Sequence, residues 1–261
     1  MNPKLYASAI EKKKGPIFIP FTVLGDPDKK TSLSIIQALI ENGADSLELG
    51  LPFSDPPADG PVIQAADTRA LAAGITVDDC FDLLTSTRSM TDIPIGLLVY
   101  FNLVLQRGID KFYKDCAESG VTSVLVADIP LEHSEEVISI AKKYGIAPVF
   151  IISELTSEER MQKIAAIAEG YLYVVSYLGV TGVEESVLEE KISAILARAR
   201  KYTDLPLCIG FGISSPESAT SAIKAGVDGV IVGSRIVREV PNIENVATIC
   251  RELSEAVRNA A

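Results

Sequence analysis

Residues 46–64 read SLELGLPFSDPPADGPVIQ, an apolar strand with one carboxylate inside it, followed by a loop rich in proline and glycine. Successive side chains of a strand point to opposite faces, so Leu47 and Leu49 share one face and Glu48 takes the other. We expect the leucines to pack beneath helices and Glu48 to point into whatever the strand lines. Burial raises the pKa of a carboxyl group, which makes Glu48 a candidate acid or base near neutral pH. The alternative is a glutamate that only pairs with a buried arginine or backbone amide.

Seven other apolar segments resemble this strand and recur along the chain with helical segments between them. They are short, β-branched and continuously apolar, which is typical of parallel strands covered on both faces. The eight expected strands span residues 17–21, 46–50, 95–100, 123–127, 148–152, 172–175, 207–211 and 229–232. Eight such units in 261 residues predict a TIM (β/α)8 barrel of class α/β, with a doubly wound open sheet as the alternative.

Hydrophobic periodicity and turn residues predict the helices that separate these strands. Several of the helices are closed by a glycine, as at Gly43 and Gly120. The expected helices span residues 5–13, 31–42, 62–73, 77–88, 109–119, 134–144, 157–168, 186–202, 216–225, 236–239 and 243–257. No linker or shift in composition divides the chain. We therefore expect residues 1–261 to form a single domain with short extra helices at the N-terminus and in the loops.

Composition excludes several classes of function. A net charge of -11 argues against nucleic acid or an anionic membrane as partner. We find no apolar run of about 18 residues that would span a membrane, and no signal peptide in residues 1–14. The four cysteines are far apart in the sequence, so we expect buried thiols in a cytoplasmic protein. The only histidine, His133, leaves little room for a Ser-His-Asp triad or a histidine-based metal site, and we expect no metal and an exposed position before a helix.

Glycine-rich loops follow the last two expected strands. Residues 212–215 lead into one helix, and residues 233–235 lead into another. In TIM barrels these two loops form the recurrent phosphate site, because glycine lets the backbone N–H groups approach the anion. We expect phosphate to bind here, although the same glycines could merely close turns; Arg235 either adds charge to the site or faces solvent. The loop Gly179–Gly182 is a candidate lid over the substrate or an ordinary connection.

Together, these motifs resemble one known family. The motifs are Glu48, PFSD at residues 52–55, ADGP at 58–61, GVTG at 179–182, GFGIS at 210–214 and Gly233-Ser234. They make the chain similar to the tryptophan synthase α-subunit family from near the N-terminus to the last expected helix. The central stretch is highly specific, whereas the phosphate loops alone fit several barrel families.

The resemblance implies a lyase that splits indole-3-glycerol phosphate into indole and glyceraldehyde 3-phosphate by a retro-aldol reaction. It also implies a partner, the pyridoxal-phosphate-dependent β subunit, which receives indole within an α2β2 complex. No cofactor is implied for this chain itself.

The resemblance further implies roles for individual residues. The family's catalytic glutamate and aspartate match Glu48 and Asp59, and the aspartate used in communication with the β subunit matches Asp55. Family contacts near the indole match Phe21, Leu98, Tyr100, Leu125, Tyr173 and Phe211. Family contacts to the phosphate match Gly182, Gly212, Gly233 and Ser234.

The sequence departs from the family pattern at three places. Pro57 stands where leucine is expected, Phe101 stands where alanine is usual, and Tyr177-Leu178 stand where Arg-Ala is commoner. None of these departures removes a catalytic group. We expect Pro57 to stiffen its loop and Tyr177-Leu178 to alter lid motion or coupling to the partner.

The implied reaction needs a group that changes its protonation state easily. Indole C3 must first be protonated, and the glycerol hydroxyl must then lose its proton as the C–C bond breaks. Glu48 is the candidate for both steps, and an ionised Asp59 would stabilise the positive charge on the indole nitrogen. One alternative is another phosphate-binding barrel enzyme, such as an isomerase or indole-glycerol-phosphate synthase, although we find no lysine placed for the latter. The other alternative is a non-catalytic regulatory subunit. The presence of both carboxylates argues against it.

Overall fold

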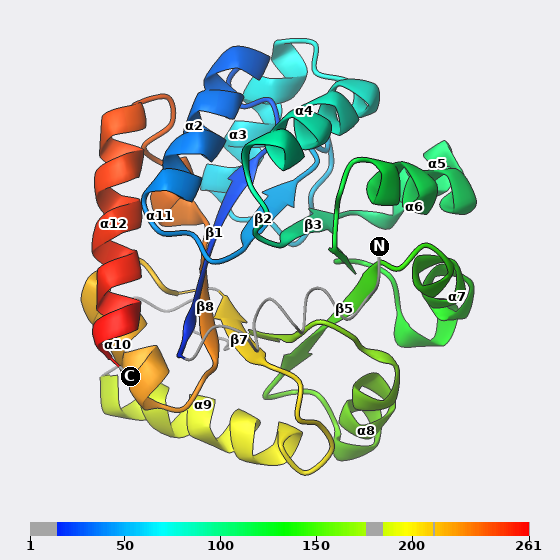
Figure 1. The fold of residues 1–261 in the computed structure, drawn as a ribbon. Coiled ribbons are helices and arrows are strands. Elements are labelled where there is room, and N and C mark those ends of the chain that lie inside the picture. Colours follow the sequence, from blue (N-terminus) through cyan, green and yellow to red (C-terminus); the bar gives the residue numbers. More distant parts are fainter. Residues whose placement is uncertain (1–14, 176–184, 211, 261) are drawn as a thin grey trace.

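Eight parallel strands close into a barrel in sequence order in the computed structural model, which describes residues 15–175, 185–210 and 212–260 (Figure 1). The strands are β1 (Ile17–Val23), β2 (Leu47–Gly50), β3 (Ile95–Val99), β4 (Ser123–Val126), β5 (Ala147–Ser153), β6 (Leu172–Val175), β7 (Leu207–Gly210) and β8 (Gly229–Val232). The barrel closes where β1 pairs with β8, with Phe18 opposite Val230. The predicted TIM barrel is therefore confirmed, and the open sheet is excluded.

Helices connect successive strands and surround the barrel (Figure 1). They are α2 (Lys29–Glu41), α3 (Pro61–Ala72), α4 (Val77–Met90), α5 (Phe101–Arg107), α6 (Ile109–Glu118), η1 (Leu131–His133), α7 (Glu135–Lys143), α8 (Glu158–Ile167), α9 (Glu185–Ala199), α10 (Pro216–Lys224), α11 (Ser234–Val237) and α12 (Ile243–Asn259). The helix expected at residues 5–13 lies outside the described residues. Helix α5 and the short turn η1 were not expected, because residues 100–102 and 128–130 were interpreted only as strand ends. His133 is exposed ahead of α7, as predicted.

Side-chain caps fix where several helices begin. Asp28 accepts a hydrogen bond from the backbone N–H of Thr31 at 2.9 Å, which starts α2. Thr76 and Asp79 form a reciprocal capping box at the start of α4. These bonds satisfy backbone N–H groups that have no partner inside the helix. These caps fix the ends of the loops before α2 and α4, whereas α3, which follows the Asp59 loop, begins after Gly60 without a side-chain cap.

The two faces of each strand bury different sets of side chains. Leu47 and Leu49 are buried among residues of the surrounding helices, as the alternation in residues 46–50 predicted. A second cluster fills the inside of the barrel and consists of Ile17, Ile19, Leu125, Val149, Tyr171, Tyr173, Cys208 and Ile231. A packed interior closes the barrel below the site, so that a ligand has access only from the ends of the strands.

The four cysteines are all buried and carry free thiols. Burial raises the pKa of the Cys80 and Cys250 thiols to about 12, so both are unreactive near neutral pH. Among the described residues, no helix is long and apolar enough to cross a membrane, and no group of acidic, histidine or cysteine side chains is arranged to hold a metal ion.

Candidate active site

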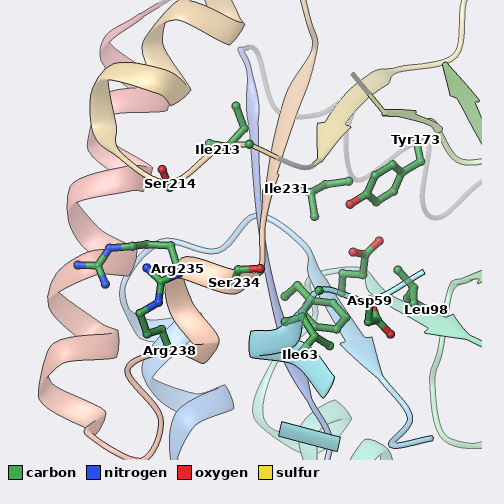
Figure 2. A pocket seen from close by; sticks show the side chains of 15 residues that line it. Asp59, Ile63, Leu98, Tyr173, Ile213, Ser214, Ile231, Ser234, Arg235 and Arg238 are labelled. Atoms are coloured by element: carbon green, nitrogen blue, oxygen red, sulfur yellow. The ribbon is translucent and has the colours of Figure 1, made fainter. Parts of the chain in front are cut away.

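The carboxyl ends of several strands surround one cavity (Figure 2). Eight of the residues expected from the sequence line it, namely Phe21, Glu48, Asp59, Leu98, Tyr173, Gly212, Gly233 and Ser234. In Figure 2, Asp59, Leu98 and Tyr173 lie on one side, and Ser214 and Ser234 lie toward the other. The structure therefore brings the two expected carboxylates and the expected phosphate loops to a single opening.

Three expected residues that the structure describes are not part of the cavity lining. Leu125 is buried in the barrel interior, and Tyr100 lies behind Asp59, whose carboxylate it contacts. Asp55 is exposed on the loop between β2 and α3. Phe211 and Gly182, together with the expected lid at 179–182, lie outside the described residues.

Glu48 occupies the inward face of β2 and is only 1% exposed. The hydroxyl of Tyr171 donates a hydrogen bond to its Oε1 at 2.8 Å. Burial raises the pKa of Glu48 to about 7; the Tyr171 hydrogen bond opposes this shift, and the charge of Asp59 adds to it. Among the described residues, no lysine or arginine forms an ion pair with Glu48. The alternative, a glutamate held by a buried arginine, is therefore not observed among the described residues.

Tyr171 is a site residue that the sequence analysis missed. It directly precedes β6, two residues before Tyr173, and its side chain is 2% exposed. Side chains two residues apart share a strand face, so both tyrosines point into the barrel. This spacing was the available signal, but it did not show which of the two hydroxyls reaches Glu48.

Asp59 is held by the loop that carries it and by the end of β3. The Tyr100 hydroxyl donates to Asp59 Oδ2 at 2.8 Å and accepts the backbone N–H of Ala58 at 3.1 Å. The Phe53 ring stacks on the Tyr100 ring with centroids 5.1 Å apart. Burial raises the pKa of Asp59, and the Tyr100 hydrogen bond opposes the shift. The aspartate is therefore partly desolvated, and Tyr100 supplies the compensating donor.

The backbone turns at the opposite side of the cavity suit an anion. Gly212 has a φ of 81°, a conformation that favours glycine, and Ser215 caps the N-terminus of α10. Gly233 directly follows β8 and lies beside the Phe21 ring, where an added Cβ would lie 3.2 Å from Phe21 Cδ1. Helix N-termini and glycine backbones present free N–H groups to anions. Arg235 also lines the cavity, so it does not simply face solvent, although it pairs with Glu239.

Gly210 leaves the space that Tyr173 fills at the end of β7. A Cβ at this position would lie 1.8 Å from the Tyr173 hydroxyl oxygen. We expect Gly210→Ala to displace the Tyr173 ring into the cavity and to raise KM by about tenfold, because the displaced ring takes up space that a ligand would fill and a tenfold loss corresponds to only about 1.4 kcal/mol of binding free energy. Steady-state kinetics on the purified variant would measure this. A KM equal to that of the unmodified chain would show that Tyr173 moves aside without affecting the substrate.

Comparison with known sequences identifies the family to which this chain belongs. The family model described as tryptophan synthase alpha chain matches residues 7–261. The chain belongs to the tryptophan synthase alpha chain family. It is 54% identical to the tryptophan synthase alpha chain of Methanoregula boonei over 230 residues, which cover 88% of this chain and 86% of that relative.

Solved structures of the tryptophan synthase alpha chain have the same architecture. The alpha subunit of Legionella pneumophila superposes with a TM-score of 0.90 at 33% identity, covering 99% of both chains. A chain of the tryptophan synthase complex from Pyrococcus furiosus superposes with a TM-score of 0.82 at 34% identity, covering 92% of this chain and 98% of that one. The resemblance stated from the sequence motifs is therefore confirmed.

Two of the three departures from the tryptophan synthase alpha chain pattern fall among the described residues. Pro57 is exposed on the loop before Asp59, and Phe101 is the first residue of α5. Tyr177-Leu178 lie outside the described residues. Phe101 also donates its backbone N–H to Asp128 Oδ1 at 2.7 Å, which ties the loops after β3 and β4 together. None of the described departures occupies the cavity.

Proposed function

We propose that this chain cleaves indole-3-glycerol phosphate to indole and glyceraldehyde 3-phosphate, with Glu48 as the proton carrier. One observation carries the proposal: a buried glutamate with a pKa of about 7 faces the same cavity as the glycine and serine backbone of the phosphate loops. Near neutral pH such a group is present in both protonation states, which is what an acid that later acts as a base requires.

The reaction uses the Glu48 proton twice. Protonated Glu48 donates its proton to indole C3, which makes the ring an electron acceptor. The ionised carboxylate then takes the proton of the glycerol hydroxyl next to the ring. As that O–H bond breaks, a C=O bond forms, the C–C bond to C3 breaks, and its electron pair returns to the ring. The products are indole and the aldehyde, and Glu48 has regained its proton.

Asp59 supplies negative charge where positive charge develops. After protonation at C3 the indole nitrogen becomes positive, and an ionised Asp59 accepts its N–H as a hydrogen bond. The bond from the Tyr100 hydroxyl, 2.8 Å long, favours the ionised form of Asp59 and fixes its orientation. The apolar side chains of Phe21, Leu98 and Tyr173 would enclose the ring. Phe211, outside the described residues, would join them.

The phosphate of the substrate would be bound across the cavity by the backbone of Gly212, Gly233 and Ser234, joined by Gly182 from outside the described residues. The cavity also holds Arg235 and Arg238, so cationic charge is present on the phosphate side. In Figure 2, Asp59 lies on the side of the opening away from Ser214, Arg235 and Arg238. This separation keeps the dianion away from the Asp59 carboxylate.

The β subunit of tryptophan synthase is the proposed partner, in an α2β2 complex located in the cytoplasm. The Pyrococcus furiosus relative comes from a tryptophan synthase complex, and Asp55 is exposed on the active-site loop, where a partner could contact it. Pyridoxal phosphate would belong to the partner, since the proton transfers above use side chains of this chain alone. Buried free thiols agree with a reducing compartment.

Indole release from indole-3-glycerol phosphate tests the proposal directly. The purified chain should release indole slowly alone and faster with saturating β subunit. Absence of indole under both conditions would contradict the proposed activity. A rate unaffected by the β subunit would contradict only the coupling through the Asp55 loop.

Removing the Tyr171 hydroxyl should shift the pH dependence of this activity. The hydroxyl stabilises ionised Glu48, so Tyr171→Phe should raise the pKa of Glu48 further, by up to about one unit. Because Glu48 must start protonated, the alkaline limb of the rate profile should move to higher pH. Tyr113→Phe, which alters a buried tyrosine on α6, is the matched control and should leave the limb in place. Identical limbs in both variants would show that Tyr171 does not tune Glu48.

A further inference from the structure

Two arginines supply all the cationic charge that the described residues bring to the cavity. Arg235 and Arg238 both line it, and Glu48 and Asp59 are the acidic residues of the same lining. In Figure 2 both arginines lie on the side of Ser234 away from Asp59. The chain carries a net charge of -11, so a dianionic substrate meets long-range repulsion, which cations at the cavity would offset.

Arg235 is the arginine next to the proposed phosphate loop. It directly follows Gly233 and Ser234 in sequence and lies on the short helix α11. Its side chain is 31% exposed, and its guanidinium group forms an ion pair with the carboxylate of Glu239. Arg238 lies at the other end of α11 and is exposed. Arg235 is therefore the better placed of the two to contact an anion held by the loop.

The ion pair between Arg235 and Glu239 is one that an anion could replace. Both side chains reach solvent, with 31% of Arg235 and 22% of Glu239 exposed, and ion pairs in contact with water contribute little to stability. Arg235 contacts Oε1 of Glu239, whereas Asn245 Nδ2 donates to Oε2 at 3.0 Å. Glu239 thus keeps a hydrogen-bond donor when Arg235 leaves. A phosphate dianion carries twice the charge of a carboxylate and presents paired acceptors to the planar guanidinium group.

We propose that Arg235 is a substrate-binding residue whose guanidinium group leaves Glu239 and binds the phosphate dianion of the substrate. The inference rests on the proposed function, because it places the phosphate beside Gly233 and Ser234. Glu239 competes with the phosphate for the same guanidinium group. The side chains of Arg235 and Glu239 therefore have opposite effects on the affinity for phosphate.

Calorimetric titration of the full chain with inorganic phosphate tests these opposite effects. Arg235→Gln should weaken binding by about tenfold, because hydrogen bonds from a charged donor are lost. Glu239→Gln should strengthen binding by about threefold, because the competing carboxylate is removed. The double variant should bind within about twofold of Arg235→Gln, since Glu239 acts through Arg235. Unchanged affinity in Arg235→Gln would overturn the proposal, and so would a double variant that binds as tightly as Glu239→Gln.

Arg160 and Glu132 provide the matched controls. They form an exposed ion pair at 2.7 Å, and neither residue lines the cavity. Arg160→Gln and Glu132→Gln change the net charge as Arg235→Gln and Glu239→Gln do, and they should leave the affinity for phosphate unchanged. Equal shifts in the control and test variants would mean that net charge alone governs binding, which would overturn the proposal.

Turnover gives a second measurement with a different signature. Arg235→Gln should raise KM for indole-3-glycerol phosphate by about tenfold and leave kcat within about twofold, because a contact to the phosphate is equally strong before and during the reaction. A loss confined to kcat would overturn the proposal. Failure of the unmodified chain to release indole would instead overturn the proposed function, and the phosphate titrations would still decide whether Arg235 binds the anion.

Discussion

Replacing Glu48 by glutamine should lower the turnover of indole-3-glycerol phosphate by about 10²-fold or more, the scale on which general acid–base groups act. Glutamine has almost the same shape and can still accept the Tyr171 hydroxyl, which lies 2.8 Å from Glu48 Oε1. It has no proton to give to indole C3 and cannot take one from the glycerol hydroxyl. Binding of inorganic phosphate should be unchanged, because the phosphate loops lie on the other side of the cavity. Indole release and phosphate binding by calorimetry measure the two effects.

The same substitution should also raise the free energy of unfolding at neutral and alkaline pH. Burial raises the pKa of Glu48 from its ordinary value of 4.5 to about 7. Below pH 4.5 both folded and unfolded chains are protonated, and the stability is fully present. Between pH 4.5 and 7 the unfolded chain ionises while the folded chain keeps its proton, so the free energy of unfolding falls, by about 3 kcal/mol in total. Glutamine does not ionise and escapes this loss.

Thermal unfolding at pH 5 and pH 8 tests this sign. The Tm of Glu48→Gln should exceed that of the unmodified chain by more at pH 8 than at pH 5. A constant difference would mean that Glu48 has an ordinary pKa in the folded chain, and it would remove the reason for choosing this residue as the initial acid. Turnover near that of the unmodified chain would exclude Glu48 from the chemistry altogether. Stability gained at the expense of activity is common at sites that bury a reactive group.

Much of the fold was predictable because the parallel strands are continuously apolar. The segment at 172–175 and the one at 229–232 match β6 and β8 at both ends. Such strands are covered on both faces, so their pattern does not depend on which residues face the helices. Helix α5 was missed because it begins at Phe101, immediately after β3 and without a capping side chain. A helix with no cap signal and no connecting loop resembles the end of a strand.

The candidate site was predictable where one stretch of sequence carries both carboxylates, and unpredictable where the stagger of the strands decides which side chains meet. Glu48 and Asp59 lie within a single stretch, and its alternation and turn residues placed both at the mouth of a barrel. The bond between Tyr171 and Glu48 joins residues 123 apart in sequence, and it depends on how β6 and β2 face each other across the interior.

Replacing Asp59 by asparagine should lower kcat by about 10²-fold while weakening substrate binding much less, because a preorganised charge acts mainly where charge develops. Asparagine can still accept the Tyr100 hydroxyl, so the bond that orients the loop is retained and only the charge is lost. Before protonation the indole nitrogen is neutral, and an amide oxygen accepts its N–H adequately. After protonation the ring is cationic, and the variant then lacks the negative charge that would stabilise it. Asp82→Asn, an exposed position on α4, is the matched control and should leave kcat unchanged.

The charge of Asp59 also gives this variant a signature in its pH profile. Asp59 helps to raise the pKa of Glu48, so its loss should lower that pKa and move the alkaline limb of the residual rate to lower pH. This direction is opposite to that expected for Tyr171→Phe, where a donor is removed instead of a like charge. Binding is measured with an analogue that lacks the glycerol hydroxyl next to the ring and cannot be cleaved. If Asp59→Asn weakened binding of this analogue as much as it lowered kcat, Asp59 would act on the neutral substrate, and another group would have to stabilise the protonated indole.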